Sequence, residues 1–173
     1  MILENERILL RHWEETDADA LYRYASDAEV GLRAGWPPHQ SVEESREVIR
    51  TDFNCDTIWA IVLKSTNEPI GAMGYFPGFR LHADSAVAEP LVGYWVGRPY
   101  WNQGICTDAL KLMIEHVCRD TDFNTLVATH FLDNPASGCV MKKCGFAPTG
   151  ETIFDDRLSG GLDKPLRVMR IKL

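Results

Sequence analysis

The stretch Val92–Leu110, VGYWVGRPYWNQGICTDAL, decides how this chain folds. It starts as an apolar run typical of a β-strand, breaks at Gly97, and passes through a turn that holds two aromatic residues. Past Gly104 the apolar spacing predicts a helix over residues 105–118. The first amide N–H groups of a helix have no partner inside it, and the helix dipole favours negative charge there. The stretch therefore predicts an anion site between a strand and a helix.

Four residues would form this anion site. Gly104 allows close approach of the backbone to an anion, and the amides of Ile105, Cys106 and Thr107 follow it in the first helical turn. Neither a GxxxxGK(S/T) motif nor a GxGxxG motif after a strand occurs, which excludes a nucleoside-triphosphate P-loop and a dinucleotide-binding fold. From this local pattern alone, anion binding and an empty strand–helix junction are equally open.

Apolar periodicity predicts further elements on both sides of the stretch. Upstream, we expect strands at residues 7–13, 57–63 and 69–76, helices from residue 15 and over residues 42–53, and a loop broken by Gly and Pro at residues 31–40. Downstream, we expect a strand at residues 125–131, a helix at 134–143, and strands at 146–154 and 166–173 joined by an Asp- and Gly-rich connection. This order predicts a mixed α/β or α+β sheet in a single domain, residues 1–173.

Composition excludes several classes of protein. The formal net charge of -7 and the pI near 5.2 argue against a nucleic-acid-binding surface, which is normally basic. No run approaches 18 apolar residues and no signal peptide is visible, so we expect no membrane span and a cytoplasmic location with reduced thiols. The five cysteines form no CxxC pair and no Cys/His cluster, so we expect no metal site.

Three segments carry a resemblance to a known family. GYWVGRPYWNQGICTDAL (93–110) resembles the acetyl-CoA-binding motif of the GNAT family of N-acetyltransferases, in particular the branch with the ribosomal-protein N-terminal acetyltransferases. Residues 134–137 (NPAS) and 143–146 (KCGF) resemble the second signature of the family, and LLRHWEETDADAL (9–21) resembles its first strand and helix. The resemblance covers nearly the whole chain in the correct order.

The resemblance implies a fold, a cosubstrate and an acceptor. The GNAT fold has a mixed central sheet of about seven strands flanked by about four helices, and here the strands carrying Val92 and Val127 would splay apart to admit acetyl-CoA. The implied acceptor is a primary amine, with a protein N-terminal α-amine as one option and a small amine (an amino acid, polyamine or aminoglycoside) as another. A non-catalytic acyl-CoA sensor is a third reading, and the implied assembly is a monomer or a homodimer.

The resemblance also implies which residues hold acetyl-CoA. The amides of Gln103, Gly104, Ile105, Cys106 and Thr107 would cradle the pyrophosphate. Backbone groups of Trp95 and Val96 would pair with the pantetheine arm, and an N–H there would polarise the thioester carbonyl. Asn134 would hydrogen-bond the pantetheine. Cys106 has a second reading as an activated thiolate, whereas a small residue packed under the pyrophosphate explains it more simply.

Acetyl transfer to an amine needs a base, and two residues are candidates. Glu89 lies two residues before Leu91, and on an extended strand it would share a face with Leu91 and Trp95. Related sequences often carry an acid at the position of Leu91, so an exposed acid at a strand edge is an equally good reading of Glu89. His130 ends the next expected strand and is the other candidate, with a locally hydrogen-bonded histidine as the commoner case.

The proton donor and the acceptor wall each have one candidate. Many family members use a tyrosine at the position of Met141, which cannot donate a proton, so Ser137 becomes the expected general acid. A serine at a helix start is also a good capping residue, which is the alternative reading. Trp36 lies where the family builds its acceptor wall, and it would line an acceptor pocket or cap the core.

Overall fold

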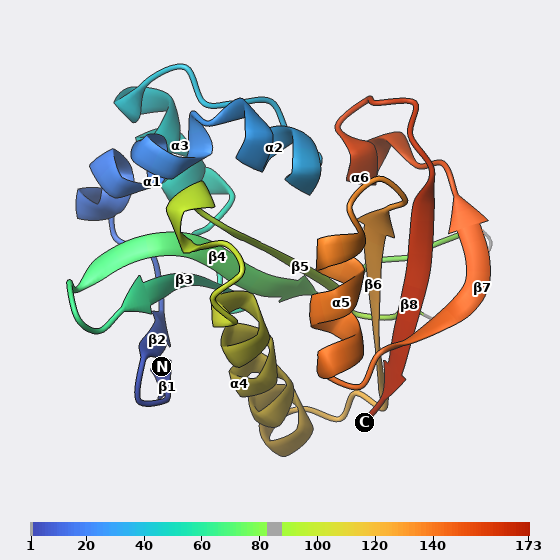
Figure 1. Ribbon diagram of the computed structural model, residues 1–173. Coiled ribbons are helices and arrows are strands. Elements are labelled where there is room, and N and C mark those ends of the chain that lie inside the picture. The colour runs from blue at the N-terminus through green and yellow to red at the C-terminus, as the bar shows by residue number, and fades with distance from the viewer. Residues whose placement is uncertain (1, 83–87) are drawn as a thin grey trace.

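An eight-stranded mixed sheet runs through the computed structural model of the chain, which describes residues 2–82 and 88–173 (Figure 1). The strands lie side by side in the order β1-β2-β3-β4-β5-β6-β8-β7. Their bounds are β1 Leu3–Glu4, β2 Ile8–Arg11, β3 Ile58–Leu63, β4 Glu68–Phe76, β5 Leu91–Val96, β6 Thr125–Phe131, β7 Ala147–Ile153 and β8 Leu166–Lys172. The predicted α+β sheet is confirmed, and the short β1 is a strand that the sequence did not predict.

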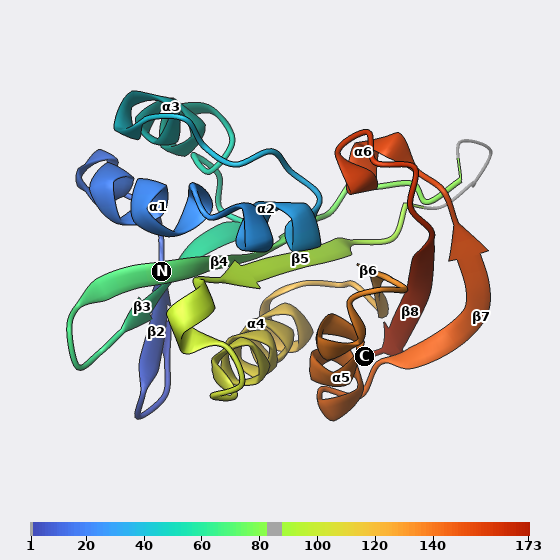
Figure 2. The ribbon, with the colours of Figure 1, turned by 45° about the horizontal axis from the view of Figure 1, so that its top comes forward.

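Helices cover both faces of this sheet (Figure 2). The described residues form the α-helices α1 Ala18–Ala25, α2 Ala28–Ala34, α3 Val42–Thr51, α4 Ile105–Asp120, α5 Pro135–Lys143 and α6 Asp156–Ser159, with 3₁₀ turns η1 Glu15–Asp17 and η2 Arg98–Tyr100. Helices α1, α2 and α3 lie over one face, whereas α4 and α5 lie over the other. The strand β5 therefore has helices on both sides.

The one parallel pair in the described sheet is β5 with β6, and it is short. Only Leu91 with Val127 and Val92 with Ala128 are in register, although β5 continues to Val96. Because the two strands diverge after these pairs, one edge of the second half of β5 has no neighbouring strand. The predicted splay between the strands of Val92 and Val127 is present.

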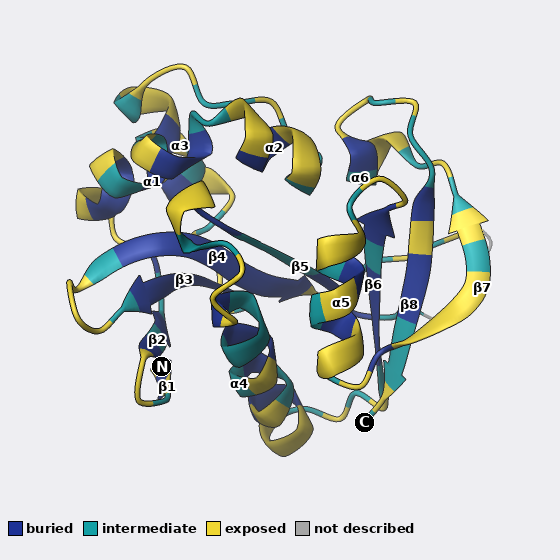
Figure 3. Cartoon of the chain, viewed as in Figure 1, coloured by how far each residue is buried: buried dark blue, intermediate teal, exposed yellow. Residues whose placement is uncertain are grey.

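Each face of the sheet has its own apolar core. On the α4 face, Ile105, Ala109, Leu110, Met113 and Val117 are buried at the helical spacing that the sequence predicted. On the other face, α1 and α3 pack residues such as Leu21 and Ile49 against β3 and β4. Cys118, which the spacing placed on the buried side of α4, is exposed. Figure 3 shows β3, β4 and β6 largely buried, whereas β7 at the edge of the sheet is largely exposed.

Two connections are more regular than the sequence predicted. The expected loop over residues 31–40 starts as part of α2, which ends at Gly35 in a left-handed conformation (φ 87°). Gly31 does not break this helix; instead it allows close packing, since a Cβ there would lie 2.7 Å from the Trp36 carbonyl oxygen. The Asp- and Gly-rich connection contains the one-turn helix α6, which begins where the Asp155 carboxylate accepts from the Arg157 amide.

Candidate active site

The turn between β5 and α4 contains two residues in the left-handed conformation, Asn102 (φ 60°) and Gly104 (φ 79°). The helical ladder begins with the amide of Asp108 donating to the Gly104 carbonyl at 3.0 Å. The three preceding amides of α4 consequently have no partner within the helix. The acid in this first turn faces away from them, because the Asp108 carboxylate pairs with Arg7 at 3.3 Å. These features make a positively polarised helix start that is open to an anion.

A cavity of about 570 Å³, here called the α4–α5 cavity, lies against this turn. It contains most of the residues that the sequence singled out, drawn from β5, the turn and the starts of α4 and α5. The predicted residues that line it are Trp95, Val96, Gly104, Ile105, Cys106, Thr107, Asn134 and Ser137. Two cationic side chains, Arg33 and Lys143, line it as well. The fold thus brings together residues from two separate motifs around one hollow.

Gln103 is predicted for this group but does not line the cavity. Its side-chain amide donates to the Pro99 carbonyl at 2.8 Å, and its own carbonyl accepts from Arg7 at 2.9 Å. Asn102 lines the cavity in its place. Asn102 was not predicted from the sequence, although asparagine adopts the left-handed conformation more readily than most residues, which is the signal that would have identified this turn position. Gln103 therefore stabilises the turn by these hydrogen bonds without lining the cavity.

The backbone of Trp95 does not lie on the free edge of β5, so it is not placed to pair with the pantetheine arm as expected. The Gly97 amide donates to Ile70 of β4 at 2.8 Å, and the Val96 carbonyl accepts from the Trp101 indole at 2.7 Å. Backbone groups alternate in direction along a strand, so those of Trp95, which is paired with Ala72, point to β4. The backbone groups of Val96 point to the edge where β6 diverges. The Trp95 ring packs beside that of Trp36, at a centroid distance of 5.6 Å.

Ser137 makes its hydrogen bond to Tyr94 and not to a helix end. The two hydroxyl oxygens lie 3.0 Å apart, and the Tyr94 hydroxyl also donates to the Ser137 carbonyl at 2.9 Å. The N-cap position of α5 is Asn134, and no side-chain cap bond is made there. Burial raises the pKa of Tyr94 far above its usual value, which keeps this phenol protonated. The sequence analysis missed Tyr94, although it lies within the quoted GYW.

Two further predicted residues have clear surroundings in this cavity. Burial raises the pKa of the Cys106 thiol to about 12, so this thiol is protonated at neutral pH and packs as a small apolar group. The Asn134 side-chain amide donates to the Arg33 carbonyl at 3.3 Å and links the start of α5 to the end of α2. The Arg33 guanidinium in turn lies 5.3 Å from the centroid of the Trp101 ring. These contacts fix the rim of the cavity.

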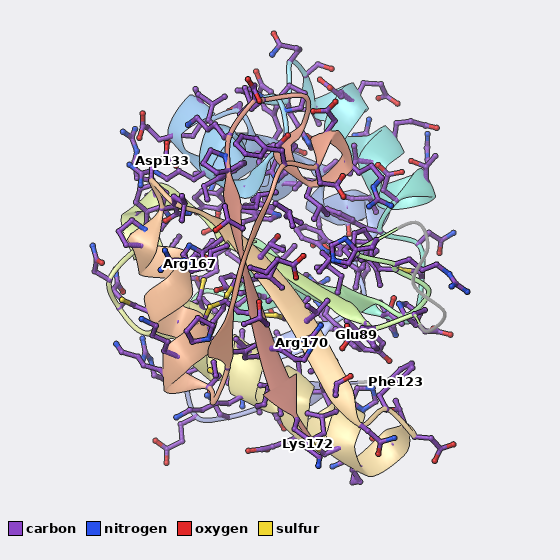
Figure 4. All side chains as sticks on the ribbon, turned by 90° about the vertical axis from the view of Figure 1, so that its right-hand side faces the viewer. Glu89, Phe123, Asp133, Arg167, Arg170 and Lys172 are labelled. Carbon is purple, nitrogen blue, oxygen red and sulfur yellow. The ribbon has the colours of Figure 1, made fainter. Side chains whose placement is uncertain are left out.

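Glu89 lies away from the α4–α5 cavity and faces Arg170 of β8 (Figure 4). Its carboxylate accepts from Arg170 at 2.9 and 2.8 Å and from Thr125 at 3.2 Å. The Arg170 guanidinium lowers the pKa of this carboxyl, which makes it a weaker base. The geometry thus speaks against the expectation that Glu89 takes the proton of the acceptor, and it favours an ion pair that joins the start of β5 to β8.

His130, the other base candidate, is packed under α5. Its Nδ1 donates to the Phe131 carbonyl at 2.8 Å, and the side chain is buried. A Cβ on Gly138 would lie only 2.6 Å from His130 Nε2, so the ring fills the space beneath that helix. This arrangement is the locally hydrogen-bonded histidine that the sequence analysis gave as the commoner case.

A second cavity of about 450 Å³, here called the α1–α3 cavity, lies on the opposite face of β5. Its wall is mainly apolar and aromatic and comes from α1, α2, α3, β3, β4, β5 and the loop after α2, with Glu44 and Asp52 exposed at its rim. It shares Ala34, Tyr94 and Trp95 with the α4–α5 cavity, so the two hollows meet beside the second half of β5.

Trp36 lines the α1–α3 cavity and also packs against the core beneath α1 and α3. Its ring centroid lies 5.6 Å from that of Trp95 and 5.6 Å from that of His39. Trp36 therefore caps the core and lines a cavity at the same time.

Comparisons with known proteins agree with this geometry. Residues 7–147 match the family model described as "Acetyltransferase (GNAT) domain". The uncharacterized N-acetyltransferase p20 of Bacillus licheniformis is 28% identical over 153 residues, which is 86% of this chain and 83% of that protein. The ribosomal-protein-serine acetyltransferase of Escherichia coli is 24% identical over 152 residues, covering 84% of this chain and 82% of that protein.

Solved structures share the fold. The acetyltransferase (GNAT family) from Bacillus anthracis superposes with a TM-score of 0.83 at 20% identity, covering 99% of this chain and 98% of that one. The microcin C7 self-immunity acetyltransferase MccE, solved in complex with acetyl-CoA and AMP, superposes with a TM-score of 0.78 at 18% identity, covering 98% and 94%.

Within the residues that the structure describes, no helix is long and apolar enough to cross a membrane. The family match spans residues 7–147, well over half of the chain. The alignments with the two named acetyltransferases cover most of the length of both proteins. A helix start open to an anion, a splayed strand pair and a hydroxyl donor beside it match what acetyl-CoA chemistry requires. The chain therefore belongs to the GNAT family and is an acetyl-CoA-dependent N-acetyltransferase.

Proposed function

We propose that the acceptor is the α-amine of a peptide or protein N-terminus and that it binds in the α1–α3 cavity. The observation that supports this proposal most directly is that the cavity is mainly apolar and meets the α4–α5 cavity at Tyr94 and Trp95. An amine in the first hollow would thus face a thioester in the second. The similarity to a ribosomal-protein-serine acetyltransferase, covering 84% of this chain, supports the same class of acceptor.

The charge around the α1–α3 cavity suits a single cationic group. Glu44 and Asp52 are the carboxylates of its rim, and Glu44 already accepts from the Gln40 amide. Polyamines and aminoglycosides carry several cationic groups and would need more acidic or polar partners than this wall offers. An N-terminal residue brings one amine together with a side chain and backbone that an apolar wall can contact. Its pKa near 8 also makes it easier to deprotonate than a lysine.

In the α4–α5 cavity, the proposed cofactor contacts are largely made by the backbone. The amides of Ile105, Cys106 and Thr107 would bind the pyrophosphate, with Arg33 and Lys143 adding positive charge. The Val96 amide lies on the open edge of β5, where it would pair with the pantetheine arm or polarise the thioester carbonyl. Asn134 would hold the pantetheine beside the start of α5.

Ser137 is the proposed general acid. Acetyl transfer forms the C–N bond to the amine and breaks the C–S bond. The departing thiolate takes a proton from Ser137 Oγ, and the proton that the new amide nitrogen loses returns to Ser137. Tyr94, which donates to the Ser137 carbonyl at rest, would turn its O–H toward Ser137 Oγ as the serine loses its proton. Because burial keeps Tyr94 protonated, it acts as a positioning and stabilising donor.

The test is a thiol-release assay with acetyl-CoA and a panel of acceptors. The panel comprises short peptides with free N-terminal serine or alanine, the same peptides with blocked N-termini, spermidine, an aminoglycoside and free amino acids. We expect turnover with the free peptides and none with the blocked ones. Fastest turnover with spermidine, the aminoglycoside or a free amino acid would overturn the proposal in favour of a small-molecule acceptor.

Substituting Trp36 then tests the location of the acceptor. Trp36→Ala should raise the KM of the peptide about 30-fold, since aromatic anchors contribute about 2 kcal/mol, while the affinity for acetyl-CoA stays the same. Phe154→Ala is the matched control, because Phe154 is 67% exposed and lines neither cavity. An unchanged peptide KM in Trp36→Ala would place the acceptor elsewhere.

A further inference from the structure

His39 is held in the wall of the α1–α3 cavity by three parts of the fold. Its backbone amide donates to the Ala25 carbonyl at the end of α1, at 3.0 Å. Its ring nitrogen Nδ1 lies 2.8 Å from the hydroxyl of Ser45 in α3, and its ring centroid lies 5.6 Å from that of Trp36. The side chain is half-buried and lines the cavity. These contacts fix the orientation of the imidazole ring in the cavity wall.

Ser45 holds the His39 ring in this orientation. It is fully buried inside α3, so its hydroxyl offers the ring a partner that is fixed by the helix. When Nδ1 carries the proton and donates to Ser45 Oγ, the lone pair is on Nε2. Among the described residues, Nε2 has no hydrogen-bond partner of its own. In that tautomer the ring accepts a proton at Nε2.

The surroundings also keep this imidazole neutral. Burial lowers the pKa of His39 from its usual 6.5, and the nearby Glu44 carboxylate opposes that shift only in part. The other ionisable groups that line the same cavity are Asp52 at the far end of α3 and Tyr94 on β5. A general base must be unprotonated at the working pH, and His39 meets that requirement at pH 7.

We propose that His39 is the general base of the acetyl transfer, taking the proton of the acceptor ammonium at Nε2 through water. The step leaves a neutral amine that attacks the thioester carbonyl carbon. The C–N bond forms, the C–S bond breaks, and the thiolate takes the proton of Ser137. The new amide nitrogen then loses its extra proton, which returns to Ser137. His39 then gives its proton to solvent. His39 lines the same cavity as Tyr94 and Trp95, which also line the α4–α5 cavity, so water in this hollow would carry the proton from the amine to Nε2.

This inference rests on the proposed function only in that the acceptor amine occupies the α1–α3 cavity. Glu89, the base expected from the sequence, lines neither cavity and is bound to Arg170. His130 is packed beneath α5. Of the three candidates, His39 is thus the one that shares a cavity with Trp95 and Tyr94.

The experiment compares the pH dependence of kcat in the wild-type enzyme and in His39→Asn. Asparagine keeps a donor near the position of Nδ1 for Ser45 but has nothing at Nε2. The acceptors are a short peptide with a free N-terminal serine and, separately, phenethylamine, an apolar primary amine. Using both keeps the two proposals distinguishable, because failure of the peptide alone overturns the N-terminal acceptor and leaves the His39 test to be made on phenethylamine.

We expect the loss in His39→Asn to shrink as the pH rises. Without a base, turnover follows the fraction of neutral amine, which at pH 7 is about one tenth for an amine of pKa near 8. The peptide kcat should therefore fall about tenfold at pH 7 and stay within about twofold of wild type at pH 9. Phenethylamine, whose pKa is higher, should show a larger loss at pH 7. Ser45→Ala should show the same trend with a smaller amplitude, because the ring remains but its direction is no longer fixed.

Two controls make the result decisive. His12→Asn removes a histidine that lines neither cavity and should leave the pH profile unchanged. Thermal unfolding and acetyl-CoA affinity report whether His39→Asn folds, and His39→Gln replaces it if it does not. A wild-type pH profile in the variants, or an equal loss at every pH, overturns the proposal, since the second result is what a purely structural role produces.

Discussion

The two cavities beside β5 are built in different ways. The α4–α5 cavity is lined by short runs of neighbouring residues, above all 94–96 and 104–107, and its most specific groups are backbone amides at a helix start. The α1–α3 cavity is lined by residues of six elements, α1, α2, α3, β3, β4 and β5, and by the loop after α2. Backbone amides suit a cosubstrate that never changes, whereas side chains can be replaced without disturbing the sheet. The helix start in the α4–α5 cavity is thus local in sequence, whereas the wall of the α1–α3 cavity depends on how distant elements pack together.

The largest expected effect concerns Ser137 in the α4–α5 cavity and its partner Tyr94, which lines both cavities. Ser137→Ala should lower kcat about 100-fold with little change in the KM for acetyl-CoA, because general acid catalysis contributes at least that factor. Tyr94→Phe should lower kcat about tenfold, since the serine remains but loses its partner at 3.0 Å. Thiol release under saturating substrates measures both.

Lys142→Ala is the control on the same helix, since Lys142 is exposed and lines neither cavity. It should leave kcat unchanged. If Ser137→Ala kept wild-type turnover while Tyr94→Phe did not, the proton would come from the tyrosine and the assignment of Ser137 would be wrong.

The next largest effect concerns the backbone conformation of Gly104, which precedes the free amides of the α4–α5 cavity. Gly104 has φ 79°, and the nearest atom to a Cβ there is Arg7 Nη1 at 3.9 Å, so a side chain has room but the backbone conformation is strained. Gly104→Val should weaken acetyl-CoA binding about 30-fold, because about 2 kcal/mol of strain shifts the free turn to another conformation. Titration calorimetry with CoA measures the affinity.

Gly104→Asn is the matched variant. Asparagine tolerates the left-handed region, so this variant should lose no more than a few-fold in affinity. Equal affinities for wild type and Gly104→Val would contradict the role of this turn in binding the pyrophosphate.

The smallest effect lies outside both cavities. Glu89→Gln should leave kcat within about twofold of wild type and lower the free energy of unfolding by about 1 kcal/mol at pH 7, because Arg170 is 40% exposed and solvent screens the pair. Arg170 lowers the pKa of Glu89 below 4.5, so this stabilisation is present above pH 4.5 and is lost as the pH falls through the lowered pKa.

Urea unfolding at pH 7 and near pH 3.5 measures the difference, which should narrow at the lower pH. A kcat loss of 100-fold in Glu89→Gln at pH 7, with stability intact, would restore Glu89 as the base and would count against His39.

Much of the fold could be predicted from the sequence because strands and helices depend on local periodicity. The strand over 125–131 and the buried face of α4 are seen where the pattern put them. The prediction was wrong where a glycine allows close packing and does not end a helix. Gly31 looked like a helix breaker, yet it belongs to α2 and makes room for Trp36. A glycine required by close packing and a glycine required by a turn look the same in a sequence.

The sequence by itself determined the strand, turn and helix of Val92–Leu110, because the conformation of Gly104 and the free amides after it depend on residues that are adjacent in the chain. Only the tertiary structure decided which side chains act together. Glu89 meets Arg170 across 81 residues and Tyr94 meets Ser137 across 43, and both contacts follow from the pairing of strands and the docking of α5. Local patterns carry no information on such contacts, since they depend on how separate elements pack against one another.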